Sequence, residues 1–365
     1  MINRQCKHLL VLEATSVKKD APSYISGYSN AFKRSTLFDV TVVNVETHNP
    51  LSERFNRWSA LAGRKFDAVI LLHSIFSSAL KLPPRWRDAL RSLRSPIVYF
   101  IANEYYRMPE KMKFAQELNV SLLVSQCFSE RVLDLYRNRL GCMAIGLPNT
   151  GFDKKCFSPG GAISERPIDI GYRMVPGHPS FGHWEREDIA VAVEKAAEGR
   201  YITDISLKIE DRFGLAGWGR FLQNSKTQLA VASGGNIFEL DDKTLMRTSD
   251  LIKSHPRATR EEIAAVYPPK SEWIPLRTLS SRIIEAAATK TPQIMYHEKL
   301  GTSFEPDIDF IALHKDHSNL SDVMDRVTDY PFLELVANNC FKKLKDHMSY
   351  DRIFTKLDTA LKALS

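Results

Sequence analysis

Cysteines are few in this sequence, and long hydrophobic runs are absent. The five cysteines are scattered over 365 residues with no CxxC spacing, so neither a disulfide framework nor a zinc site is indicated. No apolar run approaches the ~20 residues that cross a bilayer. Residues 1–13 contain no small-residue cleavage site, so we interpret them as a first strand rather than a signal peptide. The sequence therefore predicts a cytoplasmic protein, either soluble or peripheral at the inner face of a membrane.

Several common catalytic motifs are missing as well. The chain has no Walker loop (GxxxxGK followed by Ser or Thr) and no GxGxxG after a strand. These absences argue against ATPases and ordinary nicotinamide-dependent dehydrogenases. Neither the HExxH pattern of zinc peptidases nor the GxSxG elbow of serine hydrolases occurs, so a less common pattern must carry the function.

The charge is distributed unevenly along the chain. There are 50 Lys and Arg against 43 Asp and Glu, a net charge of +7. Residues 1–160 carry 23 basic and 13 acidic side chains, a net charge of +10, and the remainder carries a net charge of −3. A basic half attracts an anionic partner, which is a nucleic acid, a membrane surface, or a phosphorylated or acidic small molecule.

Short runs of Val, Ile and Leu alternate with helical patterns in the first half of the chain. The expected strands are residues 9–13, 40–46, 68–73, 97–103, 121–125 and 143–147. Apolar strands separated by helices predict a parallel sheet that is covered on both faces. A linker with three glycines at 149–163 precedes a second α/β series, and residues 331–364 are compatible with helix almost throughout.

We therefore predict an α/β protein of two Rossmann-like, doubly wound domains that face a cleft. The expected domains are residues 1–160 and 161–345, and a C-terminal helix at 346–365 is expected to return to the first domain. In each sheet the ligand loops follow the carboxyl ends of the strands, so the cleft is the expected binding site.

The segment 282–292 carries the most specific pattern. It reads RIIEAAATKTP and precedes an apolar strand at 293–296. It resembles the nucleotide-sugar motif of GT-B glycosyltransferases, in which a glutamate lies in a small-residue helix before a G-x-P turn. In that family the glutamate, here Glu285, accepts hydrogen bonds from the ribose hydroxyls. A carboxylate suits this role because its two oxygens accept from a vicinal diol. The alternative is an ordinary alanine-rich helix with a surface glutamate.

Other segments resemble one branch of these enzymes, the proteins similar to spore-maturation glycosyltransferases. The matching segments are 103–105 (NEY), 147–157, 169–182 (DIGYRMVPGHPSFG), 204–242 and 308–319. The resemblance implies a glycosyltransferase of polysaccharide or cell-envelope biosynthesis that moves a sugar from a nucleotide-sugar to a hydroxyl of a glycan, lipid-linked or cell-surface acceptor. It implies further that residues 161–345 bind the nucleotide-sugar and that residues 1–160 bind the acceptor.

The sequence departs from the family pattern at three places. Many retaining GT-B enzymes carry a second glutamate eight positions before the ribose-binding one, and Arg277 occupies that position here. Lys290 replaces the glycine of the G-x-P turn, and Asn103 begins the segment that reads DEY in the branch. These differences leave the donor sugar and the stereochemistry of transfer open.

Further donor-site candidates are cationic, glycine-rich or aromatic. Arg282 lies one helical turn before Glu285, and Arg173 follows a strand, so both are expected to contact the diphosphate, which a guanidinium fits well. Trp218 is a candidate for stacking on a base or sugar, although its spacing also fits a core-facing helix. A glycine-rich strand end can hold a phosphate through backbone N–H groups, or form a simple turn, and it consists of Ser233, Gly234 and Gly235.

Two first-domain residues are catalytic candidates. His73 and Glu104 each end an expected strand, and an inverting transferase needs a general base for the acceptor hydroxyl. No metal or cofactor is expected, because arginines, helix N-termini and glycine-rich turns can stabilise the diphosphate leaving group. The one DxD spacing, Asp307 and Asp309, leads into a strand instead of following one, and we interpret it as a loop.

The expected partners are a nucleotide-sugar and a glycan or lipid-linked acceptor. The basic helix at 84–94 suggests an anionic membrane surface as a further partner, or else a solvated helix face. No nucleic-acid partner is expected, because aromatic and basic residues are not interleaved in a known binding motif. A nucleic-acid-binding module and a non-catalytic GT-B-like sugar- or nucleotide-binding protein remain as alternatives. We take the basic half to attract an anionic glycan, a lipid phosphate or the membrane.

Overall fold

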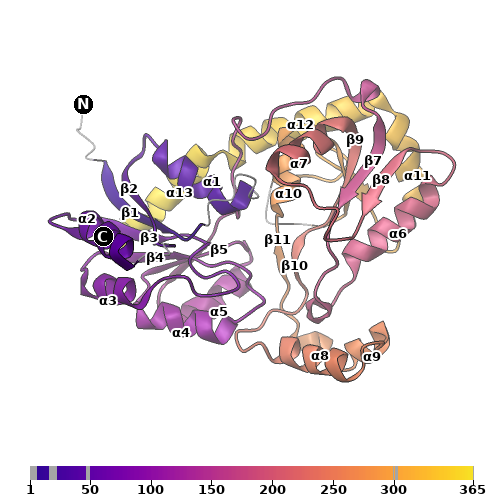
Figure 1. The fold of residues 1–365 in the computed structure, drawn as a ribbon. Helices are drawn as coiled ribbons and strands as arrows, with labels where there is room; N and C mark the ends of the chain where they lie inside the picture. Colours follow the sequence, from indigo (N-terminus) through magenta and orange to yellow (C-terminus); the bar gives the residue numbers. More distant parts are fainter. Residues whose placement is uncertain (1–5, 16–22, 47–49, 299, 301–302, 365) are drawn as a thin grey trace.

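The chain folds into two α/β halves that lie side by side, each built around its own parallel sheet (Figure 1). The structure, a computed structural model, describes residues 6–15, 23–46, 50–298, 300 and 303–364. This arrangement confirms the predicted fold class of two doubly wound domains.

The first half is a six-stranded sheet in the order β2-β1-β3-β4-β5-β6, with every neighbouring pair parallel. Each residue of the central strands β3, β4 and β5 is buried, because helices cover both faces of the sheet. The strands are β1 (Lys7–Glu13), β2 (Phe38–Asn44), β3 (Ala68–Leu71), β4 (Ile97–Phe100), β5 (Leu122–Ser125) and β6 (Met143–Gly146). The helices are α1 (Ser23–Lys33), α2 (Pro50–Leu61), α3 (Pro84–Ser92), α4 (Met108–Glu117) and α5 (Glu130–Leu140).

The second half is a five-stranded parallel sheet in the order β13-β12-β9-β7-β8, together with the antiparallel pair β10-β11. The strands are β7 (Ile168–Arg173), β8 (Thr203–Ser206), β9 (Ser225–Ala230), β10 (Ser233–Gly235), β11 (Leu276–Thr278), β12 (Gln293–Tyr296) and β13 (Ile311–Leu313). The α-helices are α6 (Glu185–Ala197), α7 (Leu215–Asn224), α8 (Lys243–Ser254), α9 (Arg260–Ala264), α10 (Ser281–Ala288), α11 (Leu320–Asp325), α12 (Tyr330–Met348) and α13 (Tyr350–Lys362). Short 3-10 helices are η1 (Ile163–Glu165), η2 (Pro179–Phe181), η3 (Lys270–Glu272) and η4 (Arg326–Thr328).

Residues 236–275, which connect β10 to β11, leave the second sheet and reach the first half (Figure 1). The Phe238 ring packs on Tyr136 of α5 at 5.6 Å, and Phe238 belongs to the first half's hydrophobic core. The Asp242 carboxylate accepts a hydrogen bond from the Met108 N–H at the start of α4 (3.0 Å). We call residues 236–275 the strap. The sequence patterns did not reveal its helices α8 and α9.

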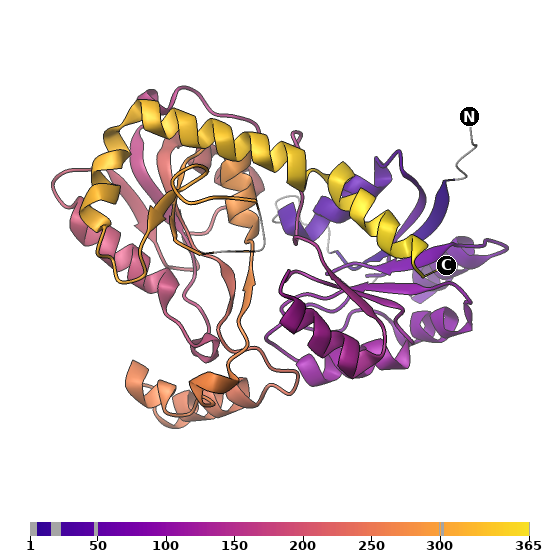
Figure 2. The same ribbon diagram turned by 180° about the vertical axis from the view of Figure 1, so that it is seen from behind.

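The C-terminal helices connect the two halves a second time. Helix α12 lies along the second half, and the chain then turns so that α13 packs on the first sheet (Figure 2). Phe354 of α13 stacks on Phe32 of α1 at 4.4 Å. The expected return of the C-terminal helix to the first half is confirmed.

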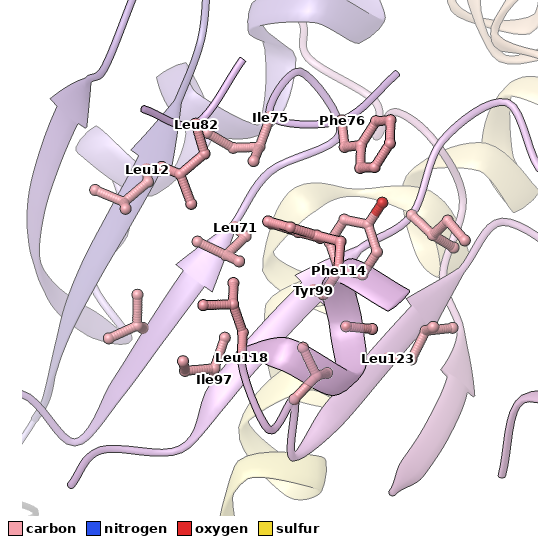
Figure 3. Close-up of a cluster of buried hydrophobic side chains, with 14 of the residues drawn as sticks. Leu12, Leu71, Ile75, Phe76, Leu82, Ile97, Tyr99, Phe114, Leu118 and Leu123 are labelled. Carbon is pink, nitrogen blue, oxygen red and sulfur yellow. The ribbon is translucent and has the colours of Figure 1, made fainter. Parts of the chain in front are cut away.

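A buried cluster anchors the loop that follows β3. Figure 3 shows Ile75 and Phe76 together with Leu12, Leu71 and Leu82 in this cluster. Ile75 and Phe76 are fully or almost fully buried. Because these two side chains are held in the core, the polar residues on either side of them keep a constant position at the carboxyl end of the sheet.

The basic segment 84–94 forms α3 and packs as an ordinary covering helix. Trp86 and Leu90 are fully buried, so Trp86 is not available to insert into a bilayer. Arg91 on the outer face pairs with Asp88 and Glu117. This packing favours the solvated-face interpretation of the segment. Within the residues that the structure describes, no helix is long and apolar enough to cross a membrane.

Candidate functional site

A cavity of about 860 Å³ lies between the two halves and receives side chains from both. It opens beyond the carboxyl ends of β3, β4 and β7, where ligands of parallel sheets bind. All but one of the predicted site residues line it, and these are Glu285, Arg282, Arg173, Trp218, Ser233, Gly234, His73 and Glu104. Gly235 is the exception among the predicted residues.

Glu285 is buried near the middle of α10 and reaches across the cavity. Its Oε2 accepts a hydrogen bond from Trp218 Nε1 (2.7 Å), and its Oε1 accepts one from Ser23 Oγ in the first half. Burial raises the pKa of this carboxyl, and the two hydrogen bonds oppose that effect. Each oxygen keeps a further lone pair, so a vicinal diol can still be accepted.

Trp218 differs from its expected role. Its indole is buried and stacks on Phe221 of the same helix (5.5 Å), while the Arg282 guanidinium lies over it at 5.4 Å. With both contacts and the hydrogen bond to Glu285, Trp218 orients two donor-site candidates instead of offering a free face. This packing favours the core-facing alternative for Trp218 over stacking on a base or sugar.

Four arginines of the second half line the cavity, and they differ in their pairing. Arg173 pairs with Asp204 and lies over Phe213 and Phe221, so much of its hydrogen-bonding capacity is used. Arg282 donates to the Met174 thioether, a weak acceptor. Among the described residues, Arg282 has no carboxylate within ion-pair distance, and the same holds for Arg186 and Arg212. The sequence patterns did not single out Arg186 and Arg212.

The N-terminus of α10 also opens into the cavity. Ser280, Ser281 and Arg282 line it there, and the buried Ser280 hydroxyl has no hydrogen-bond partner. Free N–H groups at a helix start attract anions, so this end of α10 suits a phosphate group. The two serines before Arg282 were the sequence signal for this feature, and the sequence analysis missed it.

The glycine-rich segment is a short strand. Gly234 has φ +86°, and a Cβ atom there would lie 1.9 Å from the Leu276 carbonyl oxygen of β11. A Cβ on Gly235 would lie 2.8 Å from the Phe181 carbonyl oxygen. Close backbone packing therefore accounts for both glycines, which favours the structural alternative over phosphate binding.

His73 follows β3 and is half-buried against two aromatic rings. Its imidazole lies 5.4 Å from both Tyr28 and Phe100. Burial lowers its pKa to about 4, so the ring is neutral at pH 7. A neutral imidazole can donate or accept a hydrogen bond at a sugar hydroxyl, but it is a weak base.

Glu104 is buried, and both of its carboxylate oxygens accept hydrogen bonds from first-half groups. Oε2 accepts from Ser125 Oγ (2.7 Å) and the Tyr136 hydroxyl (2.6 Å), and Oε1 accepts from the Gln126 N–H (2.8 Å). Burial raises its pKa, and these hydrogen bonds oppose the rise. The arrangement joins the ends of β4 and β5, which favours a positioning role over the predicted role of general base.

Arg277, the residue in place of the family's first glutamate, lies in a buried charge cluster behind the cavity wall. It pairs with Glu185 and Glu298, and Lys315 Nζ donates to Glu185 (2.8 Å). Lys290, in place of the family's glycine, adopts φ +53°, a left-handed conformation that glycine favours.

The DxD carboxylates lie away from the cavity and bind cations of the chain itself. Asp307 pairs with Arg326, and the buried Asp309 pairs with Lys343 (2.7 Å). This supports the interpretation of the segment as a structural loop. Among the described residues, no group of three or more His, Cys, Asp or Glu side chains is placed to hold a metal ion.

No family model matches the chain, and no curated protein does either. Among solved structures, an alpha-glucosyltransferase in complex with UDP-glucose and DNA containing an abasic site has a TM-score of 0.59 at 9% identity, over 98% of this chain and all of its own. The fold is that of a GT-B glycosyltransferase. Two further GT-B structures cover the same shares at lower scores. HepE from Anabaena with UDP-glucose has a TM-score of 0.48 at 11% identity, and sucrose-phosphate synthase from Thermosynechococcus elongatus has 0.49 at 13%.

At these identities the likeness shows the fold alone. It agrees with the predicted GT-B architecture, in which two doubly wound halves face a cavity. The narrower resemblance to spore-maturation glycosyltransferases is not confirmed by any of the matches and stays a prediction.

Proposed function

We propose that this protein is a glycosyltransferase that moves a sugar from a nucleotide-sugar to a hydroxyl group of a glycan or lipid-linked acceptor. The observation that carries the proposal is the convergence, in one GT-B cavity, of Glu285, Arg282 and the N-terminus of α10. A carboxylate suits ribose, and a guanidinium beside a helix N-terminus suits a diphosphate. The three groups follow one another along a single helix, so their spacing is rigid.

In the proposed reaction the bond between the anomeric carbon and the diphosphate oxygen breaks as the acceptor oxygen bonds to that carbon, and the proton of the acceptor hydroxyl passes to the leaving diphosphate. Arg282, Arg186 and Arg212 stabilise the negative charge that develops on the leaving phosphate, with the free N–H groups at the start of α10. These groups are in place before the reaction, so little reorganisation is needed. We propose that transfer depends on these cations and needs no bound metal ion.

The acceptor hydroxyl approaches from the first half of the chain. His73 is the candidate to hold this hydroxyl, because it lines the cavity at the end of β3 and remains neutral. Because its pKa is about 4, the imidazole is neutral at pH 7 and orients the hydroxyl by hydrogen bonding. Glu104 acts in this scheme by holding the ends of β4 and β5.

A thermal-shift screen of UDP-, GDP-, dTDP-, ADP- and CMP-sugars tests donor binding. We expect at least one to raise Tm, and we expect Glu285→Ala to abolish that shift because the ribose loses its acceptor. Glu261→Ala, an exposed change in α9, serves as the control and should keep the shift. If none of the five classes stabilises the protein, the proposal fails.

A non-catalytic sugar- or nucleotide-binding protein is the second candidate, because Arg277 replaces a glutamate that many retaining relatives use. Slow hydrolysis of the bound nucleotide-sugar, lost in Glu285→Ala, distinguishes an enzyme from a binding protein. DNA, bound by the alpha-glucosyltransferase of similar fold, is tested as an acceptor alongside saccharides.

A further inference from the structure

Most of the described cations that line the cavity come from the less basic half of the chain. The second half, with a net charge of −3, contributes all four cavity arginines. The first half, with a net charge of +10, contributes one cation, Lys81, and one carboxylate, Glu104. Lys81 Nζ is already bonded to both oxygens of Glu46 (3.1 and 3.0 Å). The described first-half wall is therefore close to electrically neutral.

Hydroxyl and amide groups make up most of this wall. Its neutral polar side chains are Thr15, Ser23, Ser74, Ser77, Ser78, Asn103, Gln126 and Asn149. Ser77 Oγ accepts from Asn103 Nδ2 (2.9 Å), which joins the loops after β3 and β4. Asn149 Oδ1 is buried without a hydrogen-bond partner. Such groups donate and accept in the same way as saccharide hydroxyls, and they bring no positive charge to balance that of a phosphate.

Two tyrosines stand at the edge of the same wall. Tyr24 of α1 and Tyr105 after β4 line the cavity, and 38% and 39% of their surfaces remain exposed. Tyr105 packs its ring against Phe181 of the second half at 4.7 Å, so it has a defined position between the halves. The C–H face of a pyranose ring is apolar, and an exposed aromatic ring is a suitable surface for it.

We propose that the first-half wall binds a neutral saccharide, with its hydroxyls on the Ser77–Asn103 pair and a sugar ring against Tyr105. This inference deepens the proposed function, since it names the class of acceptor. It differs from the sequence-based expectation of an anionic glycan or a lipid phosphate, because among the described first-half residues Lys81 is the one cation that lines the cavity, and it is bonded to Glu46.

The test measures saccharide binding to the full-length protein without any donor. Saturation-transfer NMR is recorded with neutral trisaccharides of glucose, galactose and N-acetylglucosamine, and with three anionic probes: a glucuronate trisaccharide, polyprenyl phosphate and duplex DNA. We expect at least one neutral trisaccharide to bind. Tyr105→Ala should weaken that binding about tenfold or more.

Tyr106→Ala is the matched control, because Tyr106 is the next residue, is 41% exposed, and does not line the cavity. It should leave saccharide affinity within twofold. Binding of the anionic probes alone, or equal affinity in the two tyrosine variants, overturns the inference. Because no donor is present, this result is independent of the nucleotide-sugar screen. If the protein binds a neutral trisaccharide but no donor, the inference about the first-half wall stands and the proposed transferase activity fails.

Discussion

Glu285 and Trp218 work as a pair whose members are 67 positions apart in the chain. The indole N–H holds one carboxylate oxygen, and Ser23, from the opposite half, holds the other. A donor that binds to Glu285 therefore meets a carboxylate whose direction is already set. Through its contact with Ser23, Glu285 also connects the two halves directly.

Two histidines make the stability of the protein sensitive to acid. Burial lowers the pKa of His73 and of His183 to about 4, below the usual value of about 6.5. Between these two values the unfolded chain binds protons that the folded chain does not, so stability rises with pH in this window. Each histidine then contributes a loss of up to about 3 kcal/mol as the pH falls from 6.5 to 4.

We predict that His73→Phe flattens this dependence, because the ring fits beside Phe100 and cannot be protonated. Urea unfolding at pH 7, 6, 5 and 4 measures the slope. His255→Phe, a change at the exposed end of α8, should retain the wild-type slope. An unaltered slope in His73→Phe would show that other groups cause the acid sensitivity.

At the scale of elements, the carboxyl ends of strands meet at shared polar clusters. Glu104 joins the end of β4 to β5, and Lys111 Nζ in α4 donates to the carbonyls of Ala102, Asn103 and Tyr106. In the second half, Arg277 of β11 connects the start of α6 with the residues after β12. These contacts hold the loops that carry the cavity residues.

We predict that Arg277→Met lowers the free energy of unfolding by about 3–5 kcal/mol, because two buried carboxylates lose their main partner. Arg137→Met provides the comparison. Arg137 also pairs with two carboxylates, Glu130 and Asp134, but both are exposed and Arg137 is itself only partly buried, so the cost should be below about 1 kcal/mol. Chemical denaturation of both variants gives the two values. Equal losses would show that the buried cluster contributes no more than a surface pair.

At the scale of the whole molecule, three segments of the described chain connect the two halves. The linker after β6, the helix α13 and the strap all cross between them. The strap helices α8 and α9 lie at the lower edge of the molecule in Figures 1 and 2, and α13 lies in its upper part. Opening of the cavity therefore has to accommodate contacts on both sides.

We predict that Phe354→Ala destabilises the first half by about 3–5 kcal/mol, although the residue lies near the C-terminus. The ring is 2% exposed and packs among first-half residues, so its removal leaves a cavity there. In Phe354→Ala, hydrogen exchange should show faster loss of amide protection in β1 and β3 of the first half than in β12 of the second half. Leu335→Ala on α12, where 58% of the residue is exposed, should cost less than about 0.5 kcal/mol.

The sequence by itself determined the repeating pattern of strands and helices, because burial on both faces requires continuous apolar strands. It also located Glu285 and Arg282 on one helix, since that relation is local. Only the tertiary structure decided which groups hold these side chains. Ser23 lies 262 positions from Glu285, and no local pattern connects them. The same reason explains the burial of Trp86, the inward pairing of Glu104 and the packing of the strap. Each depends on contacts between distant segments, which periodicity and spacing do not record.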